Sequence, residues 1–231
     1  MTCAGTLILF AKYPTPGKVK TRLIPAVDAE TAALLAEAFL QDVADRVART
    51  FDVNAACVLC FDPPDARGAF SELLANVPVF LERFEFVEQR GAGLGERLAL
   101  ALNDIRRTSG GPYIFIGTDT PDLPVSEIEK AATVARTGSA FLSRAHDGGY
   151  VLLALPENAP LNVFDNIAWS STYTARDQID QLKRCGIETV VSERVWRDVD
   201  EPDDLMALVA RLNADTSLAL RTQIVIRACL D

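Results

Sequence analysis

A short basic loop is the first feature of this chain with chemical potential. Residues 14–23 read PTPGKVKTRL, so Lys18, Lys20 and Arg22 closely follow Gly17. A lysine ammonium is a point charge for phosphate, an arginine guanidinium offers a fork of donors, and glycine lets backbone N–H groups approach an anion. The loop is neither a Walker loop nor a dinucleotide fingerprint. Its local sequence fits an anion-binding site and a basic surface turn equally well.

Carboxylates that directly follow apolar runs are the second feature of the chain with chemical potential. The stretch GTDTPDLP places Asp119 at the end of an expected strand, where it suits Mg²⁺ or Mn²⁺ bridging phosphate oxygens. Such an ion neutralises a diphosphate leaving group. Asp122 is a candidate second ligand, with a turn or helix cap as its alternative. From RDVDEPDDL, Asp198 or Asp200 is a candidate ligand supplied by a distant part of the chain.

The stretch RAHDGGYVLLAL holds the only histidine, His146, for which we favour a structural role over catalysis. Asp147 is the stronger candidate, either binding a sugar hydroxyl or acting as base for an acceptor hydroxyl. Its alternative is a turn in which the carboxylate bonds to the backbone. Trp169 offers an apolar wall for a sugar or base, and Ser170 or Ser171 is a candidate cap of the helix that follows.

Composition and charge limit the class of protein. The chain has 231 residues, 49% of them apolar, which fits a single α/β domain over residues 1–231. With 32 acidic and 23 basic residues the net charge is −9, so we expect no nucleic-acid partner. No run reaches about 18 apolar residues, so we expect no membrane span. The apolar N-terminal stretch lacks a preceding basic residue and predicts a first strand, not a signal peptide.

The cysteines point to a reducing compartment. There are 5, an odd number scattered along a large chain, so free thiols and a cytoplasmic protein are expected. Cys57 and Cys60 form a C-x-x-C pattern, which is either a redox or zinc half-site or part of a buried strand. We favour the strand, because no second pair completes a zinc set and residues three apart point to opposite faces.

Apolar runs alternate with helical periodicity along the chain, which predicts a doubly wound, mostly parallel sheet. In such sheets ligands bind beyond the carboxyl ends of the strands, so the loops after 12, 89, 119 and 145 and around 198 are expected to form the site. Strands are predicted at 6–12, 53–61, 84–89, 113–119, 140–145, 149–155 and 188–193; helices at 28–50 (capped by Asp28), 68–77, 91–108, 125–137, 171–186 and, as the last one, 200–213.

Six ordered stretches carry a resemblance over nearly the whole chain: FAKYPTPGKVKTRL, QRGAGLGERL, GTDTPDLP, DGGYVLLAL, NIAWSSTYT and DVDEPDDL. They resemble the glycosyltransferase-A-like proteins of the nucleotide-diphospho-sugar transferase superfamily, and within it the bacterial radical-SAM/selenodomain-associated transferases. The resemblance implies a Rossmann-like three-layer α/β/α sandwich with a mostly parallel sheet. It also implies a metal at Asp119, phosphates at Lys20 and Arg22, and a nucleotide pocket bordered by Gly93, Gly95, Glu96 and Arg97.

One departure from the family leaves the second metal ligand open. Related enzymes often carry D-x-D, whereas Thr-Pro-Asp follows Asp119 here. The resulting candidates fall into three groups. The catalytic candidates are Asp147 and Asp119; the nucleotide-binding candidates are Gly17, Lys18, Lys20, Arg22, Gly95, Glu96, Arg97 and Trp169; and the ligands of Mg²⁺ or Mn²⁺ are Asp119 and Asp200.

Three functions are compatible with these residues. The first is a metal-dependent glycosyltransferase that uses a nucleotide-diphospho-sugar and a small-molecule hydroxyl acceptor. The second is a nucleotidyltransferase, because KVKTRL also looks like the loop of phospholactate guanylyltransferases, although the G-G-x-G-x-R loop of sugar-nucleotide pyrophosphorylases is absent. The third is a non-catalytic nucleotide-binding subunit. The two enzymatic functions require the ammonium of Lys20 and the carboxylate of Asp119 to meet at one site, whereas an intact Asp119 and basic loop argue against the non-catalytic subunit.

Overall fold

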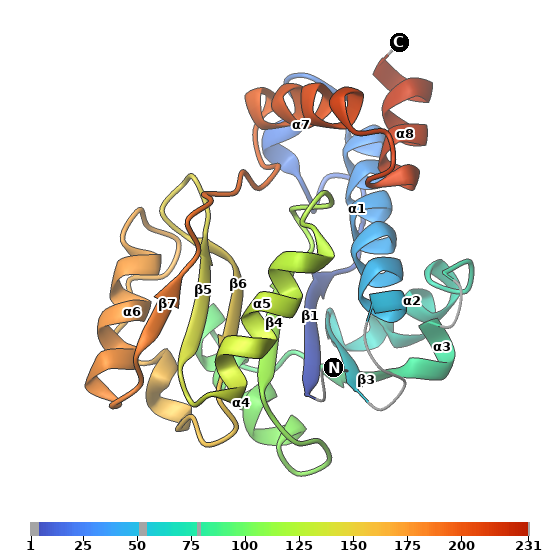
Figure 1. Ribbon diagram of the computed structural model, residues 1–231. Coiled ribbons are helices and arrows are strands. Elements are labelled where there is room, and N and C mark those ends of the chain that lie inside the picture. Colours follow the sequence, from blue (N-terminus) through green and yellow to red (C-terminus); the bar gives the residue numbers. More distant parts are fainter. Residues whose placement is uncertain (1–4, 51–54, 78–79, 231) are drawn as a thin grey trace.

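The computed structural model describes residues 5–50, 55–77 and 80–230, which form one sheet flanked by helices (Figure 1). The sheet has 7 strands in the order β3-β2-β1-β4-β6-β5-β7. β6 runs antiparallel to both its neighbours, and the other pairs are parallel, as predicted. The strands are β1 (Thr6–Lys12), β2 (Ala56–Asp62), β3 (Phe84–Glu88), β4 (Tyr113–Gly117), β5 (Ala140–Arg144), β6 (Tyr150–Leu155) and β7 (Thr189–Val191).

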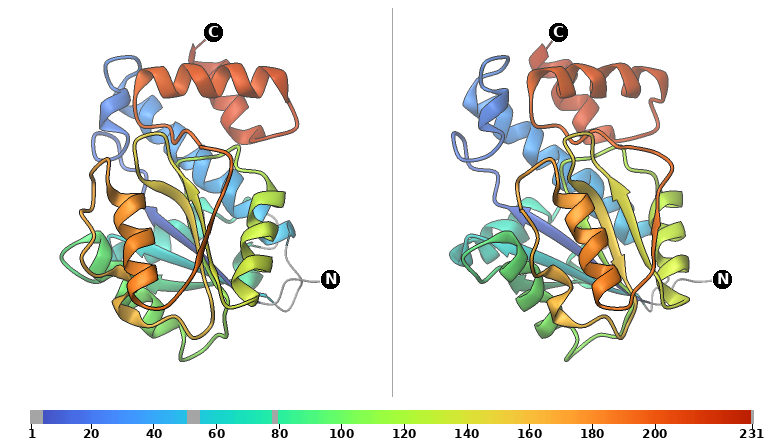
Figure 2. Two further views of the ribbon diagram at one scale, coloured as in Figure 1. Left: turned by 60° about the vertical axis from the view of Figure 1, so that its left-hand side comes forward. Right: turned by 90° about the vertical axis from the view of Figure 1, so that its left-hand side faces the viewer.

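Helices cover both faces of the sheet (Figure 2). Leu7 and Leu9 of β1 pack with α1, α2 and α5 on one face, whereas Ile8 packs with α4 and α6 on the other, because successive strand residues point to opposite sides. None of the helices in the described ranges is long and apolar enough to cross a membrane. The helices are α1 (Ala29–Thr50), α2 (Arg67–Leu73), α3 (Phe80–Arg83), α4 (Leu94–Ile105), α5 (Val125–Arg136), α6 (Thr174–Arg184), α7 (Pro202–Ala214) and α8 (Leu220–Leu230), with 3₁₀ turns η1 (Thr21–Leu23), η2 (Pro64–Ala66) and η3 (Leu161–Phe164).

The C-x-x-C pair belongs to the core of the sheet. Cys57 and Cys60 are buried free thiols of β2, and they join the hydrophobic clusters on opposite faces. Burial raises the pKa of Cys57 to about 11 and raises that of Cys60 further above its usual range. These thiols are therefore packing residues, as predicted, and not reactive nucleophiles. Cys3 and the start of the predicted strand 53–61 lie outside the described residues.

The ends of α1 and α7 follow their sequence signals. Asp28 Oδ1 accepts the Thr31 N–H at 2.7 Å at the start of α1, as predicted. At the start of α7, Asp204 accepts the backbone N–H of Glu201 at 2.9 Å, and the two residues form a capping box. This cap fixes the chain just after Asp200.

The last helix was not predicted from the sequence. The helix at 200–213 was the last one that we predicted, yet α8 follows it and packs against α1 (Figure 1). Its centre reads QIVIR, and β-branched residues lower helix propensity. A tertiary contact compensates for this, because the buried carboxylate of Asp42 on α1 accepts hydrogen bonds from the backbone N–H groups of Arg221 and Thr222 and from the Thr222 hydroxyl.

We expect Asp42→Ala to lower the free energy of unfolding by about 3 kcal/mol, because it leaves those three donors without their acceptor in a buried environment. Urea denaturation followed by circular dichroism measures this. Asp45→Ala is the matched control one turn further along α1, where the partly exposed pairs with Arg49 and, at 3.9 Å, with Arg221 contribute less than about 1 kcal/mol. Equal losses in the two variants would show that Asp42 does not anchor α8.

Candidate functional site

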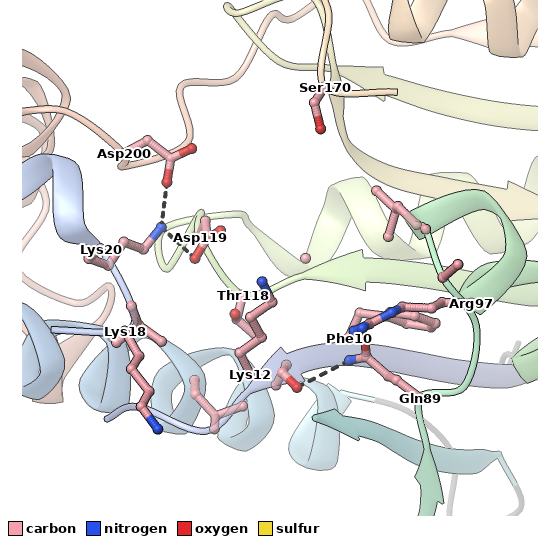
Figure 3. Close-up of a pocket in the computed structure, with 18 residues that line it drawn as sticks. Phe10, Lys12, Lys18, Lys20, Gln89, Arg97, Thr118, Asp119, Ser170 and Asp200 are labelled. Carbon is pink, nitrogen blue, oxygen red and sulfur yellow. Dashed lines mark hydrogen bonds and ion pairs between the residues drawn. The ribbon is translucent and has the colours of Figure 1, made fainter. Parts of the chain in front are cut away.

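The main cavity lies where the order of the strands reverses. From β1 the chain moves outward through β2 and β3, then returns to place β4 on the other side of β1. Loops diverge at such a point and leave a crevice beyond the carboxyl ends of the two strands. A cavity of about 640 Å³ opens there (Figure 3). Its lining includes Phe10, Lys12, Lys18, Lys20, Gln89, Gly93, Arg97, Thr118, Asp119, Ser170 and Asp200.

At one end of this cavity a lysine lies between two carboxylates. The ammonium of Lys20 is 2.6 Å from Asp119 Oδ1 and 2.8 Å from Asp200 Oδ1 (Figure 3). The Lys20 side chain is only 6% exposed, whereas those of Asp119 and Asp200 are 48% and 41% exposed. The structure thus brings together the basic loop and the mid-chain aspartate, as the sequence analysis requires.

Each member of this group is positioned by a different element. Lys20 has left-handed backbone angles, φ 47° and ψ 35°, at the start of η1. Asp119 follows β4, and its carbonyl accepts the Val199 N–H at 2.9 Å, which holds the segment before α7 against the end of β4. Asp200 therefore reaches the site because this contact and the cap of α7 fix the chain on either side of it.

The carboxylates influence one another and the lysine. Burial lowers the pKa of the Lys20 ammonium, but the charges of Asp119 and Asp200 and the hydrogen bonds to them outweigh it, so the pKa is raised overall. Burial, together with the negative charges of Asp147, Asp200 and Asp119, raises the pKa of Asp198 to about 6. The group is therefore an acidic cluster with one internal cation.

The donor set suits a hard divalent cation. Asp119 and Asp200 converge on one cationic position and keep exposed oxygens, and Mg²⁺ is commonly held by one or two carboxylates, water and substrate phosphates. Across residues 5–50, 55–77 and 80–230 no three His, Cys, Asp or Glu side chains form a metal cluster. An ion at Asp119 and Asp200 would thus need ligands from the substrate and from water.

Asp122 does not belong to this group, although it was a candidate second ligand. Its carboxylate is 3% exposed and pairs with Arg211 of α7, with Nε at 2.6 Å and Nη2 at 3.2 Å. A carboxylate occupied by a guanidinium on two oxygens has little capacity left for a metal ion. Asp122 therefore ties the loop after β4 to α7.

The other end of the cavity is built around Arg97 (Figure 3). Gln89 is buried, and its amide donates to the carbonyls of Ala11 and Cys60 at 3.1 and 2.8 Å. Its remaining oxygen accepts from Arg97 Nη1 at 3.4 Å, and Arg97 Nε donates to the Gly91 carbonyl at 3.2 Å. Arg97 Nη1 also forms an ion pair with Asp62 Oδ2 at 3.2 Å. These three contacts fix the guanidinium at the cavity wall.

Three predicted nucleotide-binding residues, Gly95, Glu96 and Trp169, do not line the cavity and instead pack or bond around the turn before α4. At Gly95 an added Cβ would lie 2.4 Å from the indole nitrogen of Trp169, so the glycine makes room for that ring. Trp169 also packs edge-on against Tyr150. Glu96 accepts the Ala92 N–H at 2.8 Å and shapes the turn before α4.

Three other candidates also lie outside the cavity lining. Gly17 has φ +73° with open space around it, and the Arg22 side chain is 72% exposed, 3.9 Å from Glu201. Asp147 Oδ1 accepts the Gly149 N–H at 2.8 Å, which is the turn we gave as its alternative. Its negative charge is one of the causes that raise the pKa of Asp198.

The loop before α6 differs from the prediction. Neither Ser170 nor Ser171 caps the helix: the cap position is Tyr173, without a side-chain hydrogen bond. Ser170 instead lines the main cavity with a left-handed φ of 57°. His146 is exposed and lines a second, smaller cavity beside α6, away from the main one, and its structural role stays a prediction.

Some lining residues were not named from the sequence. Gln89 and Thr118 follow β3 and β4 directly, and Lys12 ends β1. Their position at the carboxyl ends of strands was the available signal. No sequence signal placed Ser170 at the cavity, because only the path of its loop brings it there.

The sheet order and the cavity at the strand reversal define an α/β fold of the nucleotide-diphospho-sugar transferase type. Residues 41–171 match the model of a family described as uncharacterized proteins conserved in bacteria (DUF2064), and this chain belongs to that family. No curated protein matches the sequence.

Solved structures show the same fold. A candidate nucleotide-diphospho-sugar transferase from Desulfovibrio desulfuricans G20 superposes with a TM-score of 0.84 at 29% identity, covering 99% of this chain and 95% of that one. The 4-diphosphocytidyl-2C-methyl-D-erythritol synthase of Anaerococcus prevotii DSM 20548 gives 0.60 at 11% identity, covering 91% and 96%. Rv0371c from Mycobacterium tuberculosis H37Rv gives 0.55 at 17% identity, covering 90% and 100%.

Proposed function

We propose that this protein is a transferase that binds a nucleotide-diphospho-sugar with a divalent cation and transfers the sugar to a small hydroxyl acceptor. One observation carries the proposal: Lys20, Asp119 and Asp200 meet beyond the carboxyl ends of β1 and β4, at the wall of the main cavity. The likeness to the Desulfovibrio protein over nearly the whole of both chains supports the same class of activity.

The two ends of the cavity suit the two parts of such a donor. The diphosphate belongs at the end with Lys18, Lys20, Asp119 and Asp200, where a divalent ion, when bound, neutralises the leaving group. The nucleoside belongs at the end with Arg97, whose guanidinium donates to acceptor atoms of a base or ribose. This arrangement assigns Lys20 to the diphosphate and Arg97 to the nucleoside.

Acceptor activation requires a group that can take a proton. Burial and the negative charges of Asp147, Asp200 and Asp119 raise the pKa of Asp198 to about 6. A base acts best when its pKa is close to the working pH. We propose that the pair of Asp198 and Asp147 orients the acceptor hydroxyl and takes its proton as the oxygen attacks the anomeric carbon.

A nucleotidyltransferase is the second candidate. The same cavity would hold a nucleoside triphosphate, and a phosphorylated acceptor would displace pyrophosphate. The basic loop KVKTRL favours it, because it also looks like the loop of phospholactate guanylyltransferases. The lack of a glycine-rich loop and the match to the Desulfovibrio protein place it second.

One assay separates the candidates. The full chain is incubated with a panel of nucleotide-diphospho-sugars and Mn²⁺, and separately with the four nucleoside triphosphates and sugar phosphates. Slow release of free nucleoside diphosphate supports the first function, whereas pyrophosphate release supports the second. Nucleotide binding without either product would favour a non-catalytic subunit, and no binding in any arm would contradict all three.

We expect Arg97→Met to weaken nucleotide binding about 10-fold, because it removes charged hydrogen-bond donors from the cavity wall. Isothermal titration with the nucleoside diphosphate selected by the panel measures the effect. Arg90→Met is the matched control, since Arg90 lies nearby but pairs with Asp104 outside the cavity. Equal affinities in the Arg97 variant and the wild type would remove Arg97 from the nucleotide site.

A further inference from the structure

The Lys20 ammonium occupies the position that a divalent cation bridging Asp119 and Asp200 would need. It contacts Oδ1 of both carboxylates, at 2.6 and 2.8 Å. An ammonium and a metal ion cannot both occupy one position between two oxygens at these distances, because the two cations would repel each other and overlap. The protein therefore already has a tethered cation at its proposed metal site.

The backbone is arranged to keep the ammonium there. Lys20 adopts left-handed angles that a non-glycine residue seldom accepts and that recur at functional sites. Its carbonyl accepts the N–H of Leu23, whose fully buried side chain anchors the loop in the cluster formed with Phe39 and Val199. The loop is thus fixed on the core while the Lys20 side chain reaches inward.

The two carboxylates and the lysine differ in how far they are exposed to the cavity. Asp119 and Asp200 remain roughly half exposed, so their other oxygens face the cavity, whereas the Lys20 side chain is almost fully covered. A phosphate in the cavity would offer the ammonium an alternative anionic partner, and lysine forms strong charge-assisted hydrogen bonds to phosphate. Lys18 lines the same cavity, has no side-chain partner among the described residues and is exposed.

We propose that Lys20 is a positioning residue that competes with the divalent cation for Asp119 and Asp200 and is drawn onto the diphosphate when the nucleotide binds. The bound nucleotide would thus remove the Lys20 ammonium from the metal position. Cation and nucleotide would therefore bind cooperatively. Metal binding to the empty protein is accordingly weak. This inference rests on the proposed function, because it takes the substrate to be a nucleoside diphosphate derivative.

The first test measures Mn²⁺ affinity without nucleotide, by electron paramagnetic resonance of free Mn²⁺ over the full chain. Lys20→Met should bind Mn²⁺ at least about 10-fold more tightly than the wild type, because a competing unit charge is removed. Lys18→Met is the matched control: it removes the same charge from the same loop without touching a carboxylate, and should shift the affinity less than about 2-fold. An unchanged or weaker affinity in Lys20→Met would overturn the proposal, because a merely structural lysine gives that result.

A second measurement uses the wild type and so does not depend on the variant folding. Reductive methylation followed by mass spectrometry reports how accessible each lysine amine is. Saturating Mn²⁺ should raise modification of Lys20 several-fold relative to Lys18, because the ammonium leaves its carboxylates. If Mn²⁺ left the methylation of Lys20 unchanged, the displacement of its ammonium by the cation would be contradicted.

Failure of this inference is distinguishable from failure of the proposed function. If the chain binds nucleoside diphosphates with Mn²⁺ but Lys20→Met gains no Mn²⁺ affinity, the competition is wrong and the function stands. If none of UDP, GDP, ADP, CDP and dTDP binds with or without Mn²⁺, the proposed function is wrong. In that case tighter Mn²⁺ binding by Lys20→Met would still support the competition itself.

Discussion

Asp119→Asn is expected to reduce the release of nucleoside diphosphate from the sugar donor about 100-fold in kcat. The substitution keeps the shape of the side chain but removes one of the two carboxylates that meet at Lys20. The amide would still fill the space beside the ammonium. The neutral amide would bind the divalent cation only weakly, and that cation is what would neutralise the leaving diphosphate.

The matched control for this variant is Asp203→Asn. Asp203 is an exposed carboxylate in the first turn of α7, close to Asp200 in sequence but outside the cavity lining. It should keep activity within about 2-fold, since an exposed charge there acts only weakly on the helix. If Asp119→Asn retained activity at the level of this control, the acidic cluster would not be the catalytic centre.

The largest structural effect is expected at Gly148. Its φ is +94°, and an added Cβ would lie 2.2 Å from the carbonyl oxygen of Thr172. Neither backbone can give way easily, because the Gly148 carbonyl accepts the Ala175 N–H at the start of α6. We expect Gly148→Ala to lower the free energy of unfolding by at least about 4 kcal/mol, and to displace Ser170 from the cavity.

Gly138→Ala isolates the steric part of that loss. Gly138 has nearly the same φ, +93°, but nothing within 4 Å of the added Cβ. It should cost about 1–2 kcal/mol from backbone strain alone. Urea denaturation of both variants measures the difference, and equal losses would mean that the close approach to Thr172 is unimportant.

Much of the fold was accessible from the sequence because strand and helix signals alternate so regularly. The same regularity predicted the meeting of Lys20 and Asp119, since both follow neighbouring parallel strands. α8 was missed because its apolar residues are β-branched and its stability depends on Asp42, far away in the chain. Periodicity contains no information about such a contact.

The site residues were harder to predict because their roles depend on packing across distant segments. Gly95 matters for the room it leaves to Trp169, and Asp122 is occupied by Arg211. Lys20 was expected to face phosphate, whereas the structure places its ammonium on two carboxylates. A motif gives the type of residue at a strand end, but the direction of each side chain is set by neighbours that the motif does not include.

The central claim is that Lys20, Asp119 and Asp200 hold a diphosphate together with a divalent cation. Calorimetric titration of UDP and GDP into the wild type and Asp119→Asn, each with Mg²⁺ and with EDTA, tests it most directly. We predict that Mg²⁺ raises the affinity of the wild type for at least one of them about 10-fold or more and that Asp119→Asn loses this gain. Equal affinities with Mg²⁺ and with EDTA in the wild type would contradict the claim.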